Sequence, residues 1–361
     1  MGGNKPIWVT GFMSGTSLDG VDAACLLTDG VDICEFGPSV YRPYSAAERQ
    51  MIQGVLGKWP GAPGLEPVSK LIMAAHLEAW SQLPPAELIG FHGQTLCHDP
   101  QNSRTHQLGS GSELARRAGT AVAWDFRSED VGCGGQGAPL APIFHWALAR
   151  YKQIEEPMAI VNLGGVGNLT WIDARLPAEQ GLLAFDTGPA NAPLNDFMMK
   201  TTGHPYDVGG ALAASGRVDE ELVALFLQRP YFSRSAPKSL DRDSFSDMVE
   251  LVAQLAPADA AATLTALCVA AIEAALPLIP VQPKQVWISG GGRKNIEIMR
   301  QLAMKLPMKV YDIDDIGLDG DMLEAQAFAY LAARVARGLA TSFPATTATK
   351  APLCGGKISL P

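Results

Sequence analysis

The hydrophobic positions of this chain gather into short apolar runs that end in turns of small residues. Near the N-terminus, Ile7–Phe12 and Val21–Thr28 have the composition of strands. Between them, Ser14–Gly20 is rich in glycine, serine and threonine, which predicts a tight turn. Backbone N–H groups and hydroxyls in such a turn form a concavity that suits phosphate oxygens.

The same pattern returns in the second half of the chain. Ala159–Ile172 again reads as strand, glycine turn, strand, with Gly164 and Gly165 at the turn. A third strand, Gln285–Ile288, runs into Ser289–Gly292, where three glycines allow a purine and a ribose to approach the backbone. The repetition predicts an α/β chain with a weak internal duplication, in which two phosphate turns face each other across an interdomain cleft.

The rest of the pattern alternates strands and helices. Further strands are predicted at Asp32–Tyr41, Leu88–His92, Ala121–Phe126, Leu182–Phe185 and Lys309–Ile313. Helices are predicted at Ser45–Leu56, Val68–Gln82, Ser112–Ala118, Pro142–Tyr151, Asn295–Leu306 and Asp321–Leu339, and helices dominate Ala192–Leu276. A chain of 361 residues favours two domains.

Composition and charge exclude several classes of protein. With 28 Lys and Arg against 37 Asp and Glu, the net charge is −9, which argues against nucleic acid or an anionic membrane as the main partner. The apolar stretch Ala261–Pro280 contains Glu273 and Pro277, so we interpret it as a buried helix and not as a membrane span. Six scattered cysteines without a CxxC pair suggest reduced thiols in a cytoplasm, and Met1–Lys5 leads directly into a strand without a signal peptide.

One acidic residue is the best candidate for a chemical step. Asp186 stands at the end of an apolar strand and just before Gly188-Pro189. That placement directs a carboxylate into the mouth of a cleft, where partial burial can tune it as a general base. The alternative is a helix N-cap or turn aspartate. Asp19 and Asp207 are further loop acids, which either lie near Mg²⁺ or only close turns.

Polar segments at the ends of two strands could bind a substrate. His92-Gly93-Gln94-Thr95 and Asp125-Phe126-Arg127 offer hydrogen-bond donors to a polyhydroxyl compound, and Arg127 could pair with a carboxylate. We interpret the basic pairs Arg116-Arg117 and Arg293-Lys294 as solvated faces.

Competing motifs fit poorly. The P-loop motif GxxxxGK[ST] is absent, and Gly132–Gly137 matches GxGxxG only with polar residues before it and Pro139 close behind, which disfavours a dehydrogenase. A zinc site built from His92, Cys97, His98 and His106 would need a standard ligand spacing, which these residues lack.

Taken together, these motifs resemble one known family. Met13–Gly20 resembles the opening signature of the anhydro-N-acetylmuramic acid kinases. The resemblance continues in order through His92–Thr95, Asp125–Arg127, Gly134–Pro139, Asn162–Asn168, Phe185–Pro189, Pro237–Ser239 and Gly290–Gly292. It implies an α/β, two-domain actin-like ATPase fold (a duplicated ribonuclease H-like fold) with ATP in the interdomain cleft. The first domain would comprise residues 1–140 and 325–361, and the second residues 141–324.

The resemblance also implies an activity. Enzymes of this family use Mg²⁺ and ATP to open the 1,6-anhydro ring of 1,6-anhydro-N-acetylmuramic acid and to phosphorylate O6, which yields N-acetylmuramic acid 6-phosphate in peptidoglycan recycling. Asp186 would be the base that activates water. The family relation further implies a cytoplasmic homodimer.

Carried over residue by residue, the resemblance assigns two binding sets. The nucleotide would contact Ser14, Gly15, Thr16, Ser17, Leu18, Asp19, Gly20, Val21, Asn162, Gly164, Gly165, Gly290, Gly291 and Gly292, with Asp19 close to Mg²⁺. The sugar would contact His92, Gln94, Thr95, Asp125, Arg127 and Glu324, the last of which opens the C-terminal helix.

The chain departs from the family pattern near the expected site. Many sugar kinases of this fold carry an acid where Met13 stands, so Asp19 would take over part of that role. Ala190 and Leu194 replace a glycine and a methionine expected after the base, which leaves sugar preference open. Two alternatives therefore remain: a kinase of another anhydro sugar or of a hexose, and a non-catalytic nucleotide switch like actin or Hsp70.

Overall fold

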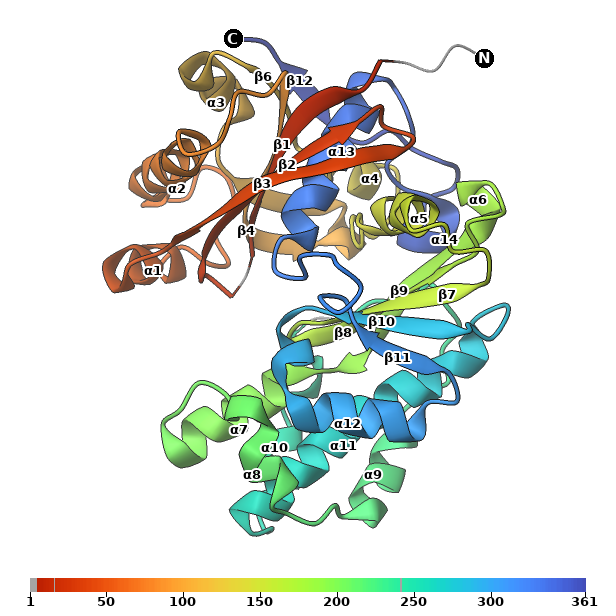
Figure 1. Ribbon diagram of the computed structural model, residues 1–361. Coiled ribbons are helices and arrows are strands. Elements are labelled where there is room, and N and C mark those ends of the chain that lie inside the picture. The colour runs from red at the N-terminus through yellow and green to blue at the C-terminus, as the bar shows by residue number, and fades with distance from the viewer. Residues whose placement is uncertain (1–4, 16, 241) are drawn as a thin grey trace. The chain divides into compact units, whose positions relative to one another are not determined.

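The computed structural model describes residues 5–15, 17–240 and 242–361 (Figure 1). Its contacts divide the chain into unit 1, Met1–Gln153 with Met322–Pro361, and unit 2, Ile154–Asp321. These divisions fall close to the expected ones, after residue 140 and before residue 325. The difference arises because helix α5 (Pro142–Tyr151) packs on a strand and a helix of unit 1.

Unit 1 is built on a seven-stranded sheet with the order β12-β6-β4-β1-β2-β3, in which β5 pairs with β4. Its strands are β1 (Ile7–Ser14), β2 (Gly20–Thr28), β3 (Ile33–Pro43), β4 (Leu88–Asp99), β5 (Arg104–Leu108), β6 (Ala121–Trp124) and β12 (Lys357–Ser359). Its helices are α1 (Ala46–Gln53), α2 (Leu65–Trp80), α3 (Gly111–Ala118), α4 (Ser128–Gly132), α5, α13 (Leu323–Ala336) and α14 (Pro344–Thr347), with the 3₁₀ turn η1 (Pro100–Asn102).

Helix α13 crosses this sheet at close range (Figure 1). A Cβ atom at Gly11 would lie 1.9 Å from the carbonyl oxygen of Ala325, and one at Gly90 would lie 2.2 Å from that of Phe328. Only glycine at these two strand positions lets the helix backbone pack directly on the sheet. The C-terminal part of the chain therefore returns to unit 1 and packs on β1 and β4 at these two glycines.

Unit 2 is built on a five-stranded sheet with the order β11-β10-β7-β8-β9. The strands are β7 (Met158–Leu163), β8 (Val166–Ile172), β9 (Leu182–Pro189), β10 (Gln285–Ser289) and β11 (Lys309–Asp312). The α-helices are α6 (Ala178–Gly181), α7 (Asn191–Thr202), α8 (Ala211–Ala214), α9 (Glu220–Leu227), α10 (Met248–Leu251), α11 (Pro257–Ala275) and α12 (Ile296–Lys305). The 3₁₀ turns are η2 (Val208–Gly210), η3 (Arg242–Phe245), η4 (Leu276–Leu278) and η5 (Gly291–Lys294).

The long apolar helix α11 belongs to the interior of unit 2. Residues 257–278, which include α11, are long and apolar enough to cross a membrane, but 72% of the most apolar window is buried. Leu264 and Leu267 of this helix pack in one core cluster with Phe226, and Val269 and Ile272 pack in another. The interpretation as a buried core helix is confirmed.

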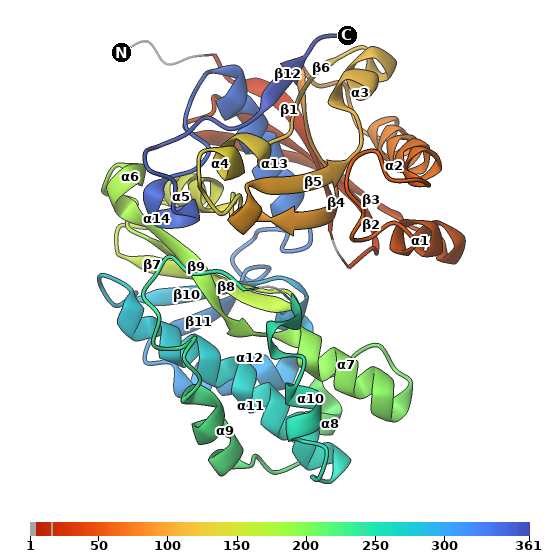
Figure 2. The same ribbon diagram turned by 180° about the vertical axis from the view of Figure 1, so that it is seen from behind.

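Both predicted hairpins form, but two strands run further than the apolar pattern indicated. β1 and β2 pair antiparallel, as do β7 and β8. β4 was expected to end at His92, yet it continues to Asp99 because it pairs with β5 (Figure 2). The sequence of β5, Arg104–Leu108, is mostly polar and gives no strand signal by itself. β9 likewise continues beyond Phe185 to Pro189, through its pairing with β8.

Candidate active site

The turn between β1 and β2 is held by side chains from within unit 1. The hydroxyl of Ser14, which is buried, donates to Gln94 Oε1 at 2.6 Å and lies 3.0 Å from the hydroxyl of Tyr44. Gln94 Nε2 donates to the carbonyl oxygen of Gly15 at 3.1 Å. Gln94 thus holds both the end of β1 and the start of the turn. Thr16 lies outside the described residues.

The second part of this turn presents polar groups outward. Leu18 has a φ of 58° and is buried, and its N–H donates to the carbonyl of Gly15 at 3.2 Å. Ser17 and Asp19 are exposed. The carbonyl of Asp19 accepts a hydrogen bond from the N–H of Tyr44 at 2.8 Å, whereas its carboxylate makes no hydrogen bond or ion pair with the residues that the structure describes. Gly20 and Val21 are both buried, and β2 begins with them directly after the turn.

In unit 2, the turn between β7 and β8 packs on the start of α7. The carbonyl oxygens of Gly164 and Gly165 accept hydrogen bonds from the N–H groups of Asn191 and Ala190, each at 3.0 Å. The side-chain amide of Asn191 donates to the carbonyl of Leu163 at 2.8 Å. These bonds fix the turn carbonyls toward the helix.

The glycine triplet after β10 lies against the same turn. Gly290 has a φ of 77°, and a Cβ atom there would lie 2.3 Å from Asn162 Oδ1. A Cβ at Gly292 would lie 2.5 Å from the Cβ of Leu163. Gly291 is exposed, and a Cβ there would meet nothing within 4 Å. Two glycines are therefore required by packing on β7, while the third leaves open space for a flat ligand.

Arg293, expected on a solvated face, is buried, so that interpretation was wrong. Its guanidinium lies 2.9 Å from carboxylate oxygens of Asp314 and Asp321 and 3.4 Å from one of Asp312, and it donates to the carbonyl of Gly290 at 3.1 Å. Three carboxylates, two from the end of β11 and the turn after it and one from Asp321, compensate the buried charge. The network fixes the glycine triplet to the end of β11 and to the last residue of unit 2.

Asp186 is half-buried on β9 and is held from both sides. One carboxylate oxygen accepts from Asn168 Nδ2 at 2.9 Å, and the other accepts from the N–H of Leu240 at 2.8 Å. Its backbone N–H donates to the carbonyl of Lys238 at 2.9 Å, and its own carbonyl accepts from the hydroxyl of Tyr231 at 2.5 Å. Hydrogen bonds to both carboxylate oxygens favour the ionised form.

His92 and Arg127 of unit 1 form one polar pair. Arg127 Nε donates to His92 Nε2 at 3.0 Å, so His92 Nδ1 carries the proton that reaches the carbonyl of Gly93 at 2.8 Å. Burial and the nearby Arg127 charge hold the pKa of His92 well below its usual range, so the imidazole is neutral. Burial lowers the pKa of Arg127 to about 10, against the opposing effects of Glu324 and Asp130, and the guanidinium stays charged at neutral pH.

The other residues of the expected sugar set are held in different ways. One carboxylate oxygen of Asp125 forms an ion pair with Lys357 Nζ at 2.6 Å, and the other accepts from the hydroxyl of Ser128. The hydroxyl of Thr95 accepts from Gln107 Nε2 at 3.3 Å. Glu324 is exposed in the first turn of α13.

Asp207 closes a turn. Its two carboxylate oxygens accept hydrogen bonds from the N–H groups of Leu212 and Ala213, each at 2.9 Å, and so hold the start of α8. Of the two readings of this residue, the turn role is the one that these contacts support. Within the described ranges, no group of three or more His, Cys, Asp or Glu side chains is placed to hold a metal ion.

Comparison with known proteins decides the family. Residues 7–360 match the family model described as anhydro-N-acetylmuramic acid kinase. The chain is 51% identical to anhydro-N-acetylmuramic acid kinase 1 of Jannaschia sp. (strain CCS1), over 99% of this chain and 96% of that protein. It is 53% identical to anhydro-N-acetylmuramic acid kinase of Cereibacter sphaeroides, over 98% of this chain and 96% of that protein. The chain belongs to the anhydro-N-acetylmuramic acid kinase family.

Each unit has an α/β fold that carries a strand-turn-strand hairpin, β1–β2 in unit 1 and β7–β8 in unit 2. Among solved structures, component A of (R)-2-hydroxyglutaryl-CoA dehydratase from Acidaminococcus fermentans is 12% identical, with a TM-score of 0.47 over 92% of this chain and 99% of that one. A ROK family glucokinase from Streptomyces griseus is 13% identical, with a TM-score of 0.42 over 90% and 99% of the two chains.

For an anhydro-N-acetylmuramic acid kinase, the structure adds residues that sequence reasoning did not single out. Asn168, Tyr231 and Leu240 hold Asp186, and Asn191 holds the unit 2 turn. The only signal was indirect: Asn168 and Lys238 lie inside segments that carry the family resemblance. Tyr231 and Leu240 are 45 and 54 positions away from Asp186 in the sequence, and a hydrophobic pattern cannot predict contacts over such separations.

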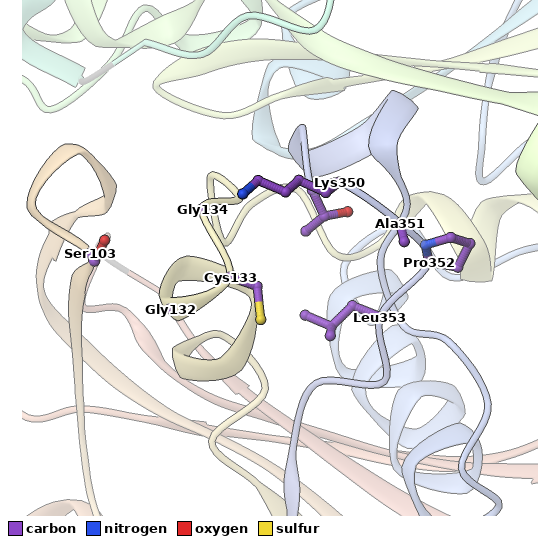
Figure 3. A pocket seen from close by; sticks show the side chains of 9 residues that line it. Ser103, Gly132, Cys133, Gly134, Lys350, Ala351, Pro352 and Leu353 are labelled. Carbon is purple, nitrogen blue, oxygen red and sulfur yellow. The ribbon is translucent and has the colours of Figure 1, made fainter.

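A cavity of about 520 Å³ also lies in unit 1 of this kinase (Figure 3). It is formed by Ser103, the segment Gly132–Gly134 and the segment Thr349–Leu353. None of the expected nucleotide or sugar residues lines it. The residues Gly135–Gly137, which follow one of its walls, include the carbonyl of Gly137 that accepts from Arg127 at 2.6 Å.

Proposed function

We propose that this protein carries out its family's reaction with Asp186 as the general base. The protein is an ATP-dependent kinase that opens the 1,6-anhydro ring of 1,6-anhydro-N-acetylmuramic acid and phosphorylates O6. One observation supports Asp186 as the base. Its half-buried carboxylate accepts hydrogen bonds from the side chain of Asn168 and from the N–H of Leu240. Hydrogen bonds to both oxygens favour the ionised form of this carboxylate and fix its direction, as a base toward water requires.

The reaction balances with few protein groups. Water gives a proton to Asp186 as its oxygen bonds to the anomeric carbon, and the bond from that carbon to O6 breaks. The electron pair left on O6 then attacks the γ-phosphorus of ATP, and ADP leaves. The proton taken up by Asp186 passes to solvent at the end of the cycle. Transfer of the phosphoryl group itself needs mainly positioning and charge neutralisation.

The residues present fit a nucleotide. Ser17 and Asp19 are exposed on the unit 1 turn, and Gly291 leaves open space beside the unit 2 turn. We assign the phosphates to these two turns and the adenosine to Gly290–Gly292. Asp19, whose carboxylate has no partner among the described residues, would approach Mg²⁺ that arrives with ATP, and the ion would neutralise charge on the transferred phosphoryl group.

Arg127 is our assignment for the carboxylate of the sugar's lactyl group. It is a charged guanidinium, partly buried, and its Nε and one terminal nitrogen are bound to His92 and to the carbonyl of Gly137. The other terminal nitrogen has no hydrogen-bond acceptor among the described residues and can donate to an acid. We further propose that the enzyme acts in the cytoplasm, in peptidoglycan recycling, as a homodimer.

The assignment is tested by Asp186→Asn. The amide keeps the shape of the side chain but cannot accept a proton from water, so we expect a fall in kcat of at least about 10²-fold. ATP binding, followed by calorimetry, should be unchanged. Turnover is measured as ADP release together with a product that carries a 6-phosphate and a free reducing end.

The control is Asp315→Asn, which removes an exposed carboxylate elsewhere in unit 2. It should leave both quantities as in the wild type. If Asp186→Asn retains turnover, another group is the base. If the wild-type protein turns over no anhydro sugar, the substrate assignment itself is wrong.

A further inference from the structure

Lys238 is a buried cation beside the proposed base. The residue is 6% exposed, and its ammonium donates to the carbonyl of Tyr231 at 3.0 Å. The nitrogen lies 4.4 Å from the centre of the Tyr231 ring and 5.9 Å from that of Phe185, the residue before Asp186. Within the described part of the chain, no carboxylate forms an ion pair with it. Burying an ammonium group costs free energy, so the position of Lys238 beside Asp186 requires a structural reason.

The segment that this lysine closes also holds Asp186. The hydroxyl of Tyr231 donates to the backbone carbonyl of Asp186, and the backbone N–H of Asp186 donates to the carbonyl of Lys238. The N–H of Leu240 donates to the Asp186 carboxylate. The ammonium of Lys238 donates to the carbonyl of Tyr231 and so closes a loop from Tyr231 to Lys238, which Leu240 follows closely along the chain. One side chain therefore closes the loop that makes two of the three hydrogen bonds to Asp186, and it fixes the residue from which the chain continues to Leu240, which donates the third.

We propose that Lys238 is a positioning residue for catalysis, which holds the Tyr231–Leu240 segment so that Leu240 fixes the direction of the Asp186 carboxylate. The proposal rests on the proposed function, because it takes Asp186 as the base. Lys238 acts through the segment and does not touch the reacting atoms. Directing the carboxylate toward one water position is the kind of constraint whose loss lowers kcat while leaving nucleotide binding intact.

The positive charge of Lys238 contributes to holding the segment in place. Attraction between an ammonium and an aromatic face requires the protonated form. Burial, with a smaller contribution from exposed Arg234, lowers the pKa of Lys238 to about 8. The other groups that face it are the Tyr231 phenol, whose pKa is raised by burial and by the Asp186 charge, and the rings of Tyr231 and Phe185. Lys238 is thus the group in this cluster that changes charge just above neutral pH.

The test compares wild type with Lys238→Met and Lys238→Arg. Methionine fills similar space without charge, so we expect kcat to fall by about 10- to 100-fold while KM for ATP changes by less than about twofold. Arginine keeps a cation and its donors, so it should restore most of kcat. Lys200→Met, at an exposed lysine of α7, is the matched control and should behave as wild type.

The pH profile of kcat separates positioning from a merely structural role. Wild type should lose activity as pH rises through about 8, because Lys238 then loses its proton. In Lys238→Arg, this fall of kcat at alkaline pH should move above pH 10. In Lys238→Met, kcat should be low at every pH and should show no such fall. Thermal unfolding of each variant shows whether it is folded, and if the arginine variant is not, wild type against Lys238→Met still decides.

Two results would overturn the inference: an unchanged kcat in folded Lys238→Met, or the same fall of kcat at alkaline pH in wild type and Lys238→Met. Both are distinct from a failure of the proposed function. That failure would appear as activity in Asp186→Asn, or as no turnover in the wild-type protein.

Discussion

Arg127 and His92 show how one hydrogen bond fixes the state of two groups. Because His92 accepts at Nε2 from a guanidinium that never loses its proton at neutral pH, the imidazole is locked as the neutral Nδ1–H form. The pKa of His92, held well below its usual range, agrees with this geometry. Arg127 keeps its positive charge available because its partner is neutral, which is what a site for an anionic group needs.

Arg127→Gln should therefore damage sugar binding more than nucleotide binding. Loss of a charge-assisted hydrogen bond to a carboxylate is expected to raise KM for 1,6-anhydro-N-acetylmuramic acid by about 10- to 100-fold, with KM for ATP unchanged. Steady-state kinetics with each substrate varied in turn gives both values.

A substrate without the carboxylate is the internal control for Arg127. With 1,6-anhydro-N-acetylglucosamine, wild type and Arg127→Gln should differ by less than about threefold, because the lost hydrogen bond has no partner there. Equal loss with both sugars would mean that Arg127 acts on the sugar ring or on His92, and not on the lactyl group.

At the scale of elements, the glycine triplet after β10 offers a matched pair of substitutions. Gly290 combines a φ of 77° with a Cβ position 2.3 Å from Asn162 Oδ1, whereas Gly291 has open space. Gly290→Ala should lower the free energy of unfolding by about 1–3 kcal/mol through strain and displacement of Asn162. Gly291→Ala should leave stability within about 0.5 kcal/mol of wild type.

For ATP binding, Gly291→Ala is the informative variant of the two. If adenosine approaches Gly291, a methyl group there weakens ATP binding in a protein of normal stability. Chemical denaturation measures the first effect, and calorimetric titration with ATP measures the second. Unchanged ATP affinity in Gly291→Ala would place the adenosine elsewhere.

The sequence predicted elements well where a local pattern carried the information. Both strand-turn-strand hairpins, α5 and α12 follow from apolar periodicity and small-residue turns. β5 was missed because its residues are polar and its only reason to be a strand is its pairing with β4. Arg293 was misread because its three carboxylate partners lie 19 to 28 positions away along the chain. The pattern singled out Asp186 as a candidate base, which stays a prediction. The contacts that hold it come from distant positions, which only the fold brings together.

At the scale of the whole molecule, buried histidines are distributed unequally. His76, His92 and His145 are buried, and all belong to unit 1, whereas His204 of unit 2 is exposed. Burial lowers the pKa of His76 and of His145 to about 4, and that of His92 is also lowered. The folded state of unit 1 therefore holds neutral imidazoles that the unfolded chain would protonate at mildly acidic pH.

This asymmetry predicts that unit 1 loses stability first in mild acid. Below pH 6.5 the unfolded chain binds protons that the folded unit cannot, so the free energy of unfolding falls as pH drops from 6.5 toward 4. From pH 6.5 to 5 the loss is about 1–2 kcal/mol for each buried histidine. Hydrogen exchange followed by peptide mapping at pH 7, 6 and 5, corrected for intrinsic rates, should show protection falling in the β1–β4 peptides before it falls in those of β7–β10.

His76→Phe supplies the control for this pH dependence. His76 lies edge-on to Phe12 and Phe91 at 5.4 and 4.9 Å between ring centres, and its buried Nε2 has no hydrogen-bond partner among the residues that the structure describes. Phenylalanine keeps the aromatic packing and removes one titrating group, so the slope of unit 1 stability between pH 6.5 and 5 should become shallower. If both units lose protection together in wild type, or if His76→Phe leaves the slope unchanged, carboxylates and not the buried imidazoles govern acid unfolding.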